Sequence, residues 1–243
     1  FPFKLISSMI KARRILKRFK PDVVIGVGGF ASGPTLKSAA SMNIPIIIQE
    51  QNSYPGVTNK IVGKKAERIC VAYDGMDKWF PEDRIVLTGN PLRNNILPLD
   101  DKKEEGLRFF NLDPNKKTIL LVGGSQGALG INKGISAQLN LFKNNDYQMI
   151  WQTGSHYYDK AVNEIQEAGL SNRVKCTVFI DRMELAYAAA DVVISRAGAI
   201  SISELSLLSK AVVFVPLPTA AEDHQTKNAQ RLVDDNAAIL VKN

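Results

Sequence analysis

Short apolar runs alternate with longer segments of helical spacing along most of the chain. Runs of strand length lie at 23–27, 44–48, 68–73, 84–88, 118–122, 147–151, 174–180, 192–195 and 212–215. Between them, helical spacing or composition predicts helices at 35–41, 57–65, 131–142, 157–168, 184–190, 200–208 and 225–234. Strands that alternate with helices of this length are typical of parallel sheets covered on both faces, so we predict an α/β protein.

The alternation is interrupted once, by a mixed segment at 97–106 that contains Pro98 and a charged run. A chain of 243 residues is long enough for two domains of ordinary size. We therefore place a domain boundary just before this segment, which gives one domain at 1–93 and a second at 94–243.

The central stretch, TILLVGGSQGALGIN at 118–132, predicts a buried strand, a tight glycine turn and a helix start. Gly123, Gly124 and Gly127 let the backbone approach a ligand closely, and Ser125 adds a hydroxyl donor. A helix N-terminus offers free N–H groups and partial positive charge, so a phosphate is the expected ligand. Taken alone, such a loop is equally well explained as a turn that only needs positive φ.

This loop does not fit a dinucleotide cofactor. Its glycine spacing is GGxxG rather than GxGxxG. The next strand is followed by Gln152 and Thr153, where a dinucleotide fold places a ribose-binding Asp or Glu. The sequence therefore indicates a phosphate and argues against NAD.

A second glycine-rich turn, 28–34, follows the strand at 23–27 and precedes a helix, which is the same strand, glycine turn and helix pattern as at 118–132. The strand at 44–48 ends in Gln49, Glu50, Gln51 and Asn52. Open α/β sheets bind ligands at the carboxyl ends of their strands, so these side chains are candidate ligand contacts. A plain polar loop is the alternative.

Two more polar clusters follow predicted strands in the second half, at 195–204 and 222–228. Glu204 falls early in a predicted helix, where a carboxylate can accept both hydroxyls of a ribose. Stabilisation of the helix dipole is the structural alternative for this carboxylate. His224 by itself is more typical of a solvated side chain than of a catalyst.

The net charge is +7, and residues 1–20 hold seven basic residues and no acidic one. This segment predicts an amphipathic helix in which Leu5, Met9, Ala12, Leu16 and Phe19 share helical spacing. One interpretation is a core helix with a solvated basic back. The other is a face that rests on anionic lipid. Nucleic acid is a weaker alternative, because no aromatic-rich basic platform follows.

Other classes find little support in the composition. No apolar run is long enough to cross a bilayer, and the first residues do not form a signal-peptide pattern. Two histidines and two separated cysteines do not suggest a zinc cluster. The chain starts without Met inside structured-looking sequence, so we expect a fragment.

Eight segments, taken together and in order, resemble the MurG family. They are GGFASGP (28–34), EQN (50–52), GNPLR (89–93), GGSQGA (123–128), FIDRM (179–183), SRAGAISISE (195–204), FVPLP (214–218) and DHQTKNA (223–229). The resemblance implies a GT-B architecture, in which two Rossmann-like domains with parallel sheets face each other across a cleft. It also implies an inverting transferase that moves N-acetylglucosamine from UDP-N-acetylglucosamine to undecaprenyl-pyrophosphoryl-MurNAc-pentapeptide in peptidoglycan synthesis.

The resemblance also implies roles in donor binding. Ile180 would border the uracil, Glu204 would hold the ribose hydroxyls, and Arg93 would lie near the diphosphate. The diphosphate itself would be bound by Ser125 and by the backbone of Gly123, Gly124 and Gly127. A second segment, at the start of the helix after the strand at 192–195, would help to bind it through Ala199, Ile200, Ser201, Ile202 and Ser203. Asn52 and Gln225, with His224 beside it, would contact the sugar.

The remaining implied contacts belong to the acceptor and the membrane. The acceptor pyrophosphate would be bound by Gly28, Gly29, Ser32 and Gly33. The first helix would dock on an anionic membrane through Phe1, Phe3, Ile6, Ile10, Lys11 and Arg14. The family works peripherally at the cytoplasmic face of the bacterial inner membrane, in cell-wall biogenesis and hence in cell shape and division. No cofactor or metal is expected, and the chain has no Asp-x-Asp motif.

The chain departs from the family pattern in places that concern catalysis. The first glycine-rich loop of the family, with the histidine often proposed as base, is absent, and the family's HEQN segment is QEQN here, with Gln49 in the histidine's place. The chain also stops at Asn243, before the family's closing helices, so the fragment could be inactive alone. Within it, Glu50 is the remaining candidate for base work or orientation.

Two other functions stay open. A UDP-sugar epimerase shares the architecture but would need several acidic and basic catalytic groups in the cleft. Few such groups are present in the segments QEQN (49–52) and DHQ (223–225). A non-catalytic nucleotide-sugar-binding or scaffold protein at the membrane is the second alternative.

Overall fold

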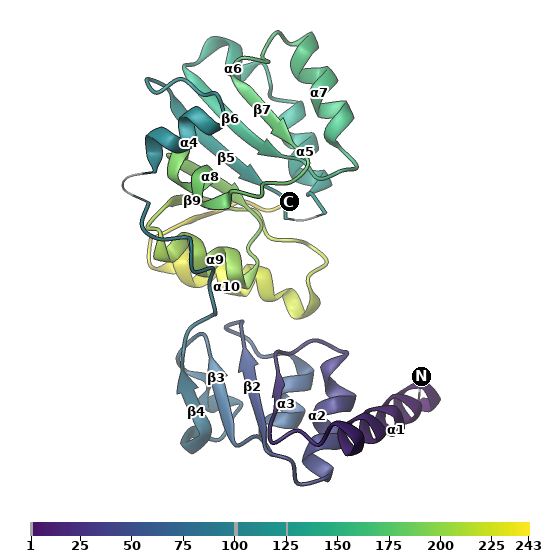
Figure 1. The fold of residues 1–243 in the computed structure, drawn as a ribbon. Coiled ribbons are helices and arrows are strands. Elements are labelled where there is room, and N and C mark those ends of the chain that lie inside the picture. The colour runs from purple at the N-terminus through teal and green to yellow at the C-terminus, as the bar shows by residue number, and fades with distance from the viewer. Residues whose placement is uncertain (1, 100–101, 125) are drawn as a thin grey trace. The chain divides into compact units, whose positions relative to one another are not determined.

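The computed structural model describes residues 2–99, 102–124 and 126–243. Figure 1 shows a mixed α/β chain that divides into two compact units, Phe1–Pro91 and Leu92–Asn243. Each unit is built on its own sheet, and within each sheet all paired strands are parallel. The α/β class and the two parallel sheets predicted from the sequence are therefore confirmed.

The first unit holds a sheet of order β1-β2-β3-β4. Its strands are β1 (Val24–Gly26), β2 (Ile46–Glu50), β3 (Arg68–Val71) and β4 (Ile85–Leu87), and its helices are α1 (Pro2–Phe19), α2 (Ser32–Ser41) and α3 (Val57–Gly63), with short 3-10 turns at Met76–Lys78 and Glu82–Arg84. Ile46 and Ile48 of β2 alternate with less buried neighbours and pack in one cluster with Leu36 of α2 and Val62 of α3. This alternation places the helices on one face of the sheet.

Helix α1 is attached to the first unit by a narrow stripe. Ala12 and Leu16 are buried, and the Ser38 hydroxyl of α2 donates to the Met9 carbonyl at 3.3 Å. Leu5 and Phe19, predicted to share this stripe, are 38% and 77% exposed, so that part of the prediction is wrong. Among the described residues, no partner surface covers these two side chains.

The second unit holds a sheet of order β10-β9-β8-β5-β6-β7. The strands are β5 (Lys117–Val122), β6 (Tyr147–Gln152), β7 (Val174–Thr177), β8 (Val192–Ser195), β9 (Ala211–Phe214) and β10 (Ile239–Leu240). The chain fills one side of β5 first, then crosses to the other side with β8. The neighbouring pair β5 and β8 is therefore the topological switch point, where doubly wound sheets open a crevice for ligands.

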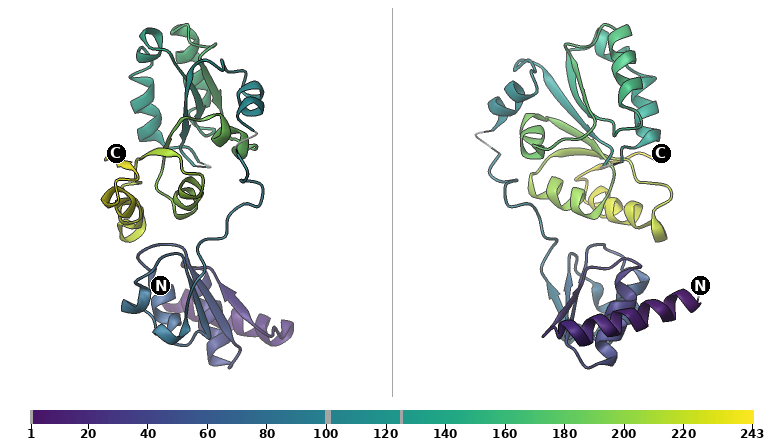
Figure 2. Two further views of the ribbon diagram at one scale, coloured as in Figure 1. Left: turned by 90° about the vertical axis from the view of Figure 1, so that its left-hand side faces the viewer. Right: turned by 45° about the vertical axis from the view of Figure 1, so that its right-hand side comes forward.

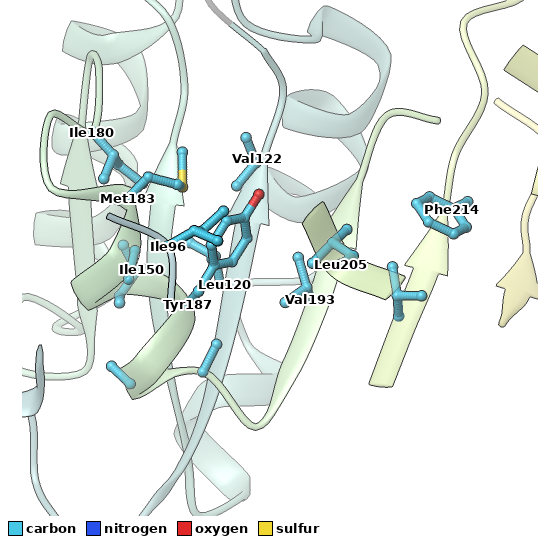
Figure 3. Close-up of a cluster of buried hydrophobic side chains, with 14 of the residues drawn as sticks. Ile96, Leu120, Val122, Ile150, Ile180, Met183, Tyr187, Val193, Leu205 and Phe214 are labelled. Carbon is cyan, nitrogen blue, oxygen red and sulfur yellow. The ribbon is translucent and has the colours of Figure 1, made fainter. Parts of the chain in front are cut away.

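Helices cover both faces of this second sheet, as Figure 2 shows. One face packs against α5 (Leu129–Ser136), α6 (Leu141–Asn144) and α7 (Tyr158–Glu167), and the other against α4 (Lys103–Phe109), α8 (Met183–Ala189), α9 (Ala199–Leu207) and α10 (His224–Asp234). Strand β5 supplies both cores by alternation: Leu121 faces the first group, whereas Leu120 and Val122 face the second. Figure 3 shows the second core around Leu120.

One helix prediction in the second unit is wrong. The single helix predicted at 131–142 is split into α5 and α6, because residues 137–140 form tight turns beside the buried Leu139 and Phe142. The charged segment before β5 is partly helical, since Leu107 of α4 joins the core beside α8. Strand β2 also continues through Gln49 and Glu50, two residues beyond its predicted end.

The boundary between the units falls between Pro91 and Leu92, two residues before the predicted position. Arg93 therefore belongs to the second unit. Ile96, which is 2% exposed, inserts into the core cluster that contains Leu120 and Tyr187. This anchor ties the segment after residue 91 to the second unit.

Replacement of Leu120 by Ala should lower the free energy of unfolding of the second unit by about 3 kcal/mol, because the side chain is fully buried between a helix layer and the sheet. Trp151 lies in this unit and Trp79 in the other, so urea unfolding followed in a Trp79→Phe background reports on the second unit. Leu129→Ala, at a position 59% exposed, is the control and should change little. Equal effects of the two substitutions would contradict the assigned core.

Candidate nucleotide-binding site

A cavity of about 540 Å³ opens at the carboxyl ends of β5, β8 and β9, beside the switch point. Segments far apart in the sequence line it: the turn after β5, the turn after β8 and the loop after β9. The lining residues are Gly123, Gly124, Gln126, Gly127, Ala128, Leu129, Gly130, Ser195, Arg196, Gly198, Ser201, Leu217, Pro218, Thr219, Gln225 and Asn243.

The glycine turn after β5 is held tightly against the end of β6. Gly124 and Gly127 have φ of 83° and 75°, and the Gly127 N–H donates to the Gly124 carbonyl at 2.9 Å. A Cβ on Gly127 would lie 2.1 Å from the Thr153 carbonyl oxygen. Both the left-handed conformation and the close approach therefore require glycine at position 127. Ser125, predicted to donate to the diphosphate, lies outside the described residues.

Side chains from β6 and α5 support this turn from behind. The Gln152 amide donates to the Gly124 carbonyl at 3.1 Å. Asn132 joins the same layer: its amide donates to the Thr153 carbonyl at 2.8 Å, and its carbonyl accepts from the Trp151 indole at 3.0 Å. All are buried, so they restrict the turn to one conformation. The sequence singled out Gln152 only as an argument against NAD.

Two helices begin at this cavity. Ala128 and Gly198, the residues before α5 and α9, have extended backbones, and neither helix has a side-chain cap at its start. Leu129 and Gly130, the first two residues of α5, line the cavity, as do Gly198 and Ser201 at the start of α9. Uncapped N–H groups and the positive ends of two helix dipoles favour an anion here.

Arg196 is a lining residue to which the sequence analysis gave no role. Its guanidinium donates to the carbonyls of Val215 and Pro216 at 3.0 and 2.9 Å, which ties the loop after β9 to the turn after β8. Burial lowers the pKa of Arg196 from its ordinary value, and the group remains cationic at neutral pH. The only signal in the sequence was an isolated basic residue between a strand and a glycine.

The other donor residues expected from the resemblance fall into two groups. Gln225 lines the cavity, and its side-chain carbonyl accepts from the Leu217 N–H at 2.9 Å. His224 starts α10 beside it, while Ala199, Ile200 and Ser203 lie in the first turns of α9. The side chains of Ile180 and Ile202 are 3% exposed and belong to the core, so neither side chain is placed to contact a ligand.

Glu204 is 2% exposed and is held by two partners. The Tyr187 hydroxyl donates to Oε2 at 3.0 Å, and Arg93 Nε lies 3.1 Å from Oε1. The Arg93 contact is an ion pair without the alignment of a hydrogen bond, so Oε1 stays buried with no hydrogen bond. The structure thus brings together two predicted donor residues, Arg93 and Glu204, and adds Tyr187, which the sequence analysis did not identify.

The polar cluster of the first unit is organised by Glu50, which is 2% exposed at the end of β2. Oε1 accepts from the backbone and side-chain amides of Asn52, both at 3.1 Å. Oε2 accepts from the Gly56 N–H at 3.1 Å and from the Asn59 amide at 2.8 Å. A carboxylate with four donors has little acceptor capacity left, so this geometry favours the orienting role of Glu50 over the role of a base.

The glycine turn of the first unit leads into α2. Gly28 and Gly29 have φ of 81° and 76°, and the Ser32 hydroxyl donates to the Gly29 carbonyl at 3.0 Å. The Gln51 amide donates to the Val27 carbonyl at 2.9 Å, which joins this turn to the Glu50 cluster. Gly33 is the second residue of α2. The predicted acceptor residues and the Glu50 cluster therefore occupy one edge of the first sheet.

Within the described residues, no group of three or more His, Cys, Asp or Glu side chains is arranged to hold a metal ion. No helix in this part of the chain combines the length and the apolarity needed to cross a membrane.

A doubly wound parallel sheet with a glycine turn and two helix N-termini at its switch point is the arrangement typical of nucleotide-binding α/β proteins. Comparison with known families narrows this class. Residues 118–243 match the glycosyltransferase family 28 C-terminal domain, and residues 1–71 match the glycosyltransferase family 28 N-terminal domain.

Individual proteins that are similar to this chain support these family matches. The chain is 58% identical over 240 residues to the UDP-N-acetylglucosamine--N-acetylmuramyl-(pentapeptide) pyrophosphoryl-undecaprenol N-acetylglucosamine transferase of Bacteroides thetaiotaomicron, covering 98% of this chain and 64% of that protein. The crystal structure of Acinetobacter baumannii MurG matches with a TM-score of 0.76 at 33% identity, covering 100% of this chain and 67% of that one. The UDP-GlcNAc 2-epimerase of Neisseria meningitidis, at 15% identity and a TM-score of 0.60, shares the fold.

The chain belongs to the MurG group of glycosyltransferase family 28. It spans about 64% of the length of the curated relatives that it matches.

Replacement of Glu50 by Gln should lower the free energy of unfolding of the first unit by about 2 kcal/mol, because either orientation of the new amide sets its NH2 group against two donors. Urea unfolding followed by Trp79 fluorescence in a Trp151→Phe background measures the effect. The exposed Glu67→Gln is the matched control. An unchanged midpoint for Glu50→Gln would show that the four-donor cluster does not form.

Proposed function

We propose that this chain supplies the donor site and part of the acceptor side of an inverting glycosyltransferase. The reaction moves N-acetylglucosamine from UDP-N-acetylglucosamine to the undecaprenyl-pyrophosphoryl-MurNAc-pentapeptide of peptidoglycan synthesis. The observation that carries the proposal is the convergence of a glycine turn, two uncapped helix N-termini and Arg196 on one cavity. The relatives at 49–58% identity are named as transferases of N-acetylglucosamine to this lipid-linked acceptor, which supports this choice of substrates.

In this reaction the acceptor hydroxyl attacks the anomeric carbon, its proton passes to a base, and the bond to the diphosphate breaks with UDP leaving. Negative charge grows on the diphosphate as this bond breaks. The starts of α5 and α9 border the cavity and Arg196 adds a positive charge to its lining, so they would stabilise this charge. Glu204 would accept the ribose hydroxyls, and Gln225 would contact the sugar.

The first unit would bind the acceptor. Gly28, Gly29, Ser32 and Gly33 would contact its pyrophosphate at the start of α2, a ten-residue helix. We assign Glu50 the orientation of Asn52 rather than proton transfer, because its four donors leave the carboxylate little capacity to accept a further proton or hydrogen bond. The transferase is preferred over an epimerase, since the epimerases share the fold at only 11–16% identity.

We further propose that α1 docks the protein on the cytoplasmic face of the inner membrane, where cell-wall synthesis supports cell shape and division. Phe3, Ile6 and Ile10 are 85%, 55% and 48% exposed and recur at helical spacing with Arg14. Lys11 flanks this face and is exposed, whereas Phe1 lies outside the described residues. Apolar side chains rimmed by cations fit the interface of an anionic bilayer.

Calorimetric titration tests the donor site. We expect saturable binding of UDP-N-acetylglucosamine and no binding of NAD. Ser201→Asp should weaken donor binding at least roughly tenfold, because it sets a carboxylate among the N–H groups that would receive the diphosphate. An acidic residue in the first turn favours the helix, so loss of folding is not expected.

Ser206→Asp, on the exposed side of α9 and outside the cavity, is the control and should leave binding nearly unchanged. Absence of donor binding by a chain with normal circular dichroism would overturn the proposal. NAD binding of similar strength would point back to a dinucleotide enzyme.

Vesicle co-sedimentation tests the membrane face. Ile10→Ser should lower partitioning onto phosphatidylglycerol vesicles several-fold, because burial of an apolar side chain contributes about 1.5–3 kcal/mol when complete. Ile15→Ser is the matched control: Ile15 is 65% exposed on the same helix but points away from the Phe3–Ile6–Ile10 face. High salt should weaken binding of the wild type. Equal losses for both variants, or equal binding to neutral vesicles, would contradict this docking face.

A further inference from the structure

The buried hydroxyl of Tyr187 fixes one oxygen of Glu204. Tyr187 and Glu204 are 3% and 2% exposed, and the hydroxyl donates to Oε2 at 3.0 Å. Figure 3 shows the Tyr187 ring within the core cluster beside Ile96 and Leu120. A ring packed in this way has no freedom to swing, so the direction of its hydroxyl determines the orientation of the carboxylate.

The other oxygen of Glu204 is available. Oε1 is buried and accepts no hydrogen bond, although Arg93 Nε lies 3.1 Å away. The Arg93 side chain is 49% exposed and can move into solvent without loss of packing in the core. A buried carboxylate oxygen without a hydrogen-bond donor is unfavourable, and a ligand hydroxyl that donates to it would remove that cost.

The geometry of α9 places Oε1 of Glu204 next to the cavity in which we propose that the UDP-sugar binds. Ser201 lines the cavity at the start of α9, and Glu204 follows three residues later, on the same face of the helix. A diphosphate at the helix start therefore sets the next group of the nucleotide about one turn along α9. In UDP that group is the ribose, whose two hydroxyls are donors.

We propose that Tyr187 is a positioning residue for nucleotide recognition: it holds Oε2 of Glu204 so that Oε1 faces the ribose hydroxyls. This inference rests on the proposed function, in which UDP occupies the cavity. Burial, together with the neighbouring Glu204 carboxylate, raises the pKa of Tyr187, so the phenol keeps its proton and remains a donor at physiological pH. When ribose binds, it replaces Arg93 as the partner of Oε1.

A purely structural role for the Tyr187 hydroxyl would be to join α8 to α9. That role predicts a loss of stability and an equal weakening of all nucleotides. Positioning of Glu204 predicts a selective loss, limited to nucleotides that carry the ribose hydroxyl. The ratio of affinities for UDP and 2′-deoxy-UDP separates the two roles.

We would titrate UDP and 2′-deoxy-UDP calorimetrically into the wild type, Tyr187→Phe and Tyr157→Phe. The wild type should prefer UDP about tenfold, as expected for one hydroxyl bound to a carboxylate. Tyr187→Phe keeps the ring and should reduce this preference to about twofold or less. Tyr157 is a matched control, because it is also buried in this unit and shares a single side-chain hydrogen bond, with Ser136 at 2.9 Å. Tyr157→Phe should keep the full preference.

A double-mutant cycle with Glu204→Gln completes the test. Tyr187→Phe should change the preference little once Glu204 has been replaced, because both act on the same contact. A Tyr187→Phe variant that retains the wild-type preference would overturn the inference and leave the proposed function intact. A wild type that binds UDP without preferring it would overturn the role of Glu204 and with it that of Tyr187. A folded wild type that binds no UDP would overturn the proposed function itself.

Discussion

The second unit depends on the parallel pairing of β5 with β6 on one side and β8 on the other. The chain leaves β5 and β8 toward opposite faces of the sheet, so the segments after these two strands diverge, and the helices that follow both start beside the crevice between them. The cavity, the glycine turn and the positive ends of α5 and α9 are consequences of this one topological choice. Glycine at position 127 is then required, since the turn has to pass within contact distance of the Thr153 carbonyl.

Two buried carboxylates, Glu50 and Glu204, differ in role because their hydrogen-bond partners differ. Glu50 has both oxygens occupied by donors of its own loop, so it rigidifies the end of β2. Glu204 has one oxygen occupied by Tyr187 and the other in contact with a half-exposed Arg93 only. Both are 2% exposed, and burial alone does not distinguish them. The number of hydrogen-bond donors around each carboxylate does distinguish them, because a ligand hydroxyl can donate only to an oxygen that the protein's own donors leave unoccupied.

Much of the fold could be predicted from local patterns. Strand runs such as 118–122 and 192–195 are apolar on both sides because both faces of the second sheet are covered, and such runs are easy to recognise. Failures came where packing outweighed local pattern. The helix predicted at 131–142 divides because Leu139 and Phe142 gain more from burial than from continuous helical hydrogen bonds. On α1, Phe19 shares the helical spacing of Leu16, yet Phe19 is 77% exposed, whereas Leu16 is buried in the cluster that contains Leu36 of α2.

By itself the sequence determined the α/β class, the two-unit organisation and the glycine turns, and it predicted an anion as ligand, because each follows from residue types at close spacing. It also carried the family resemblance, through eight segments in order. Only the tertiary structure decided that Arg196 lines the cavity, that Gln152 supports the glycine turn, and that Tyr187 and Arg93 meet at Glu204. These contacts join residues from different strands and helices, and which of them meet depends on sheet order and helix packing, which no local pattern encodes.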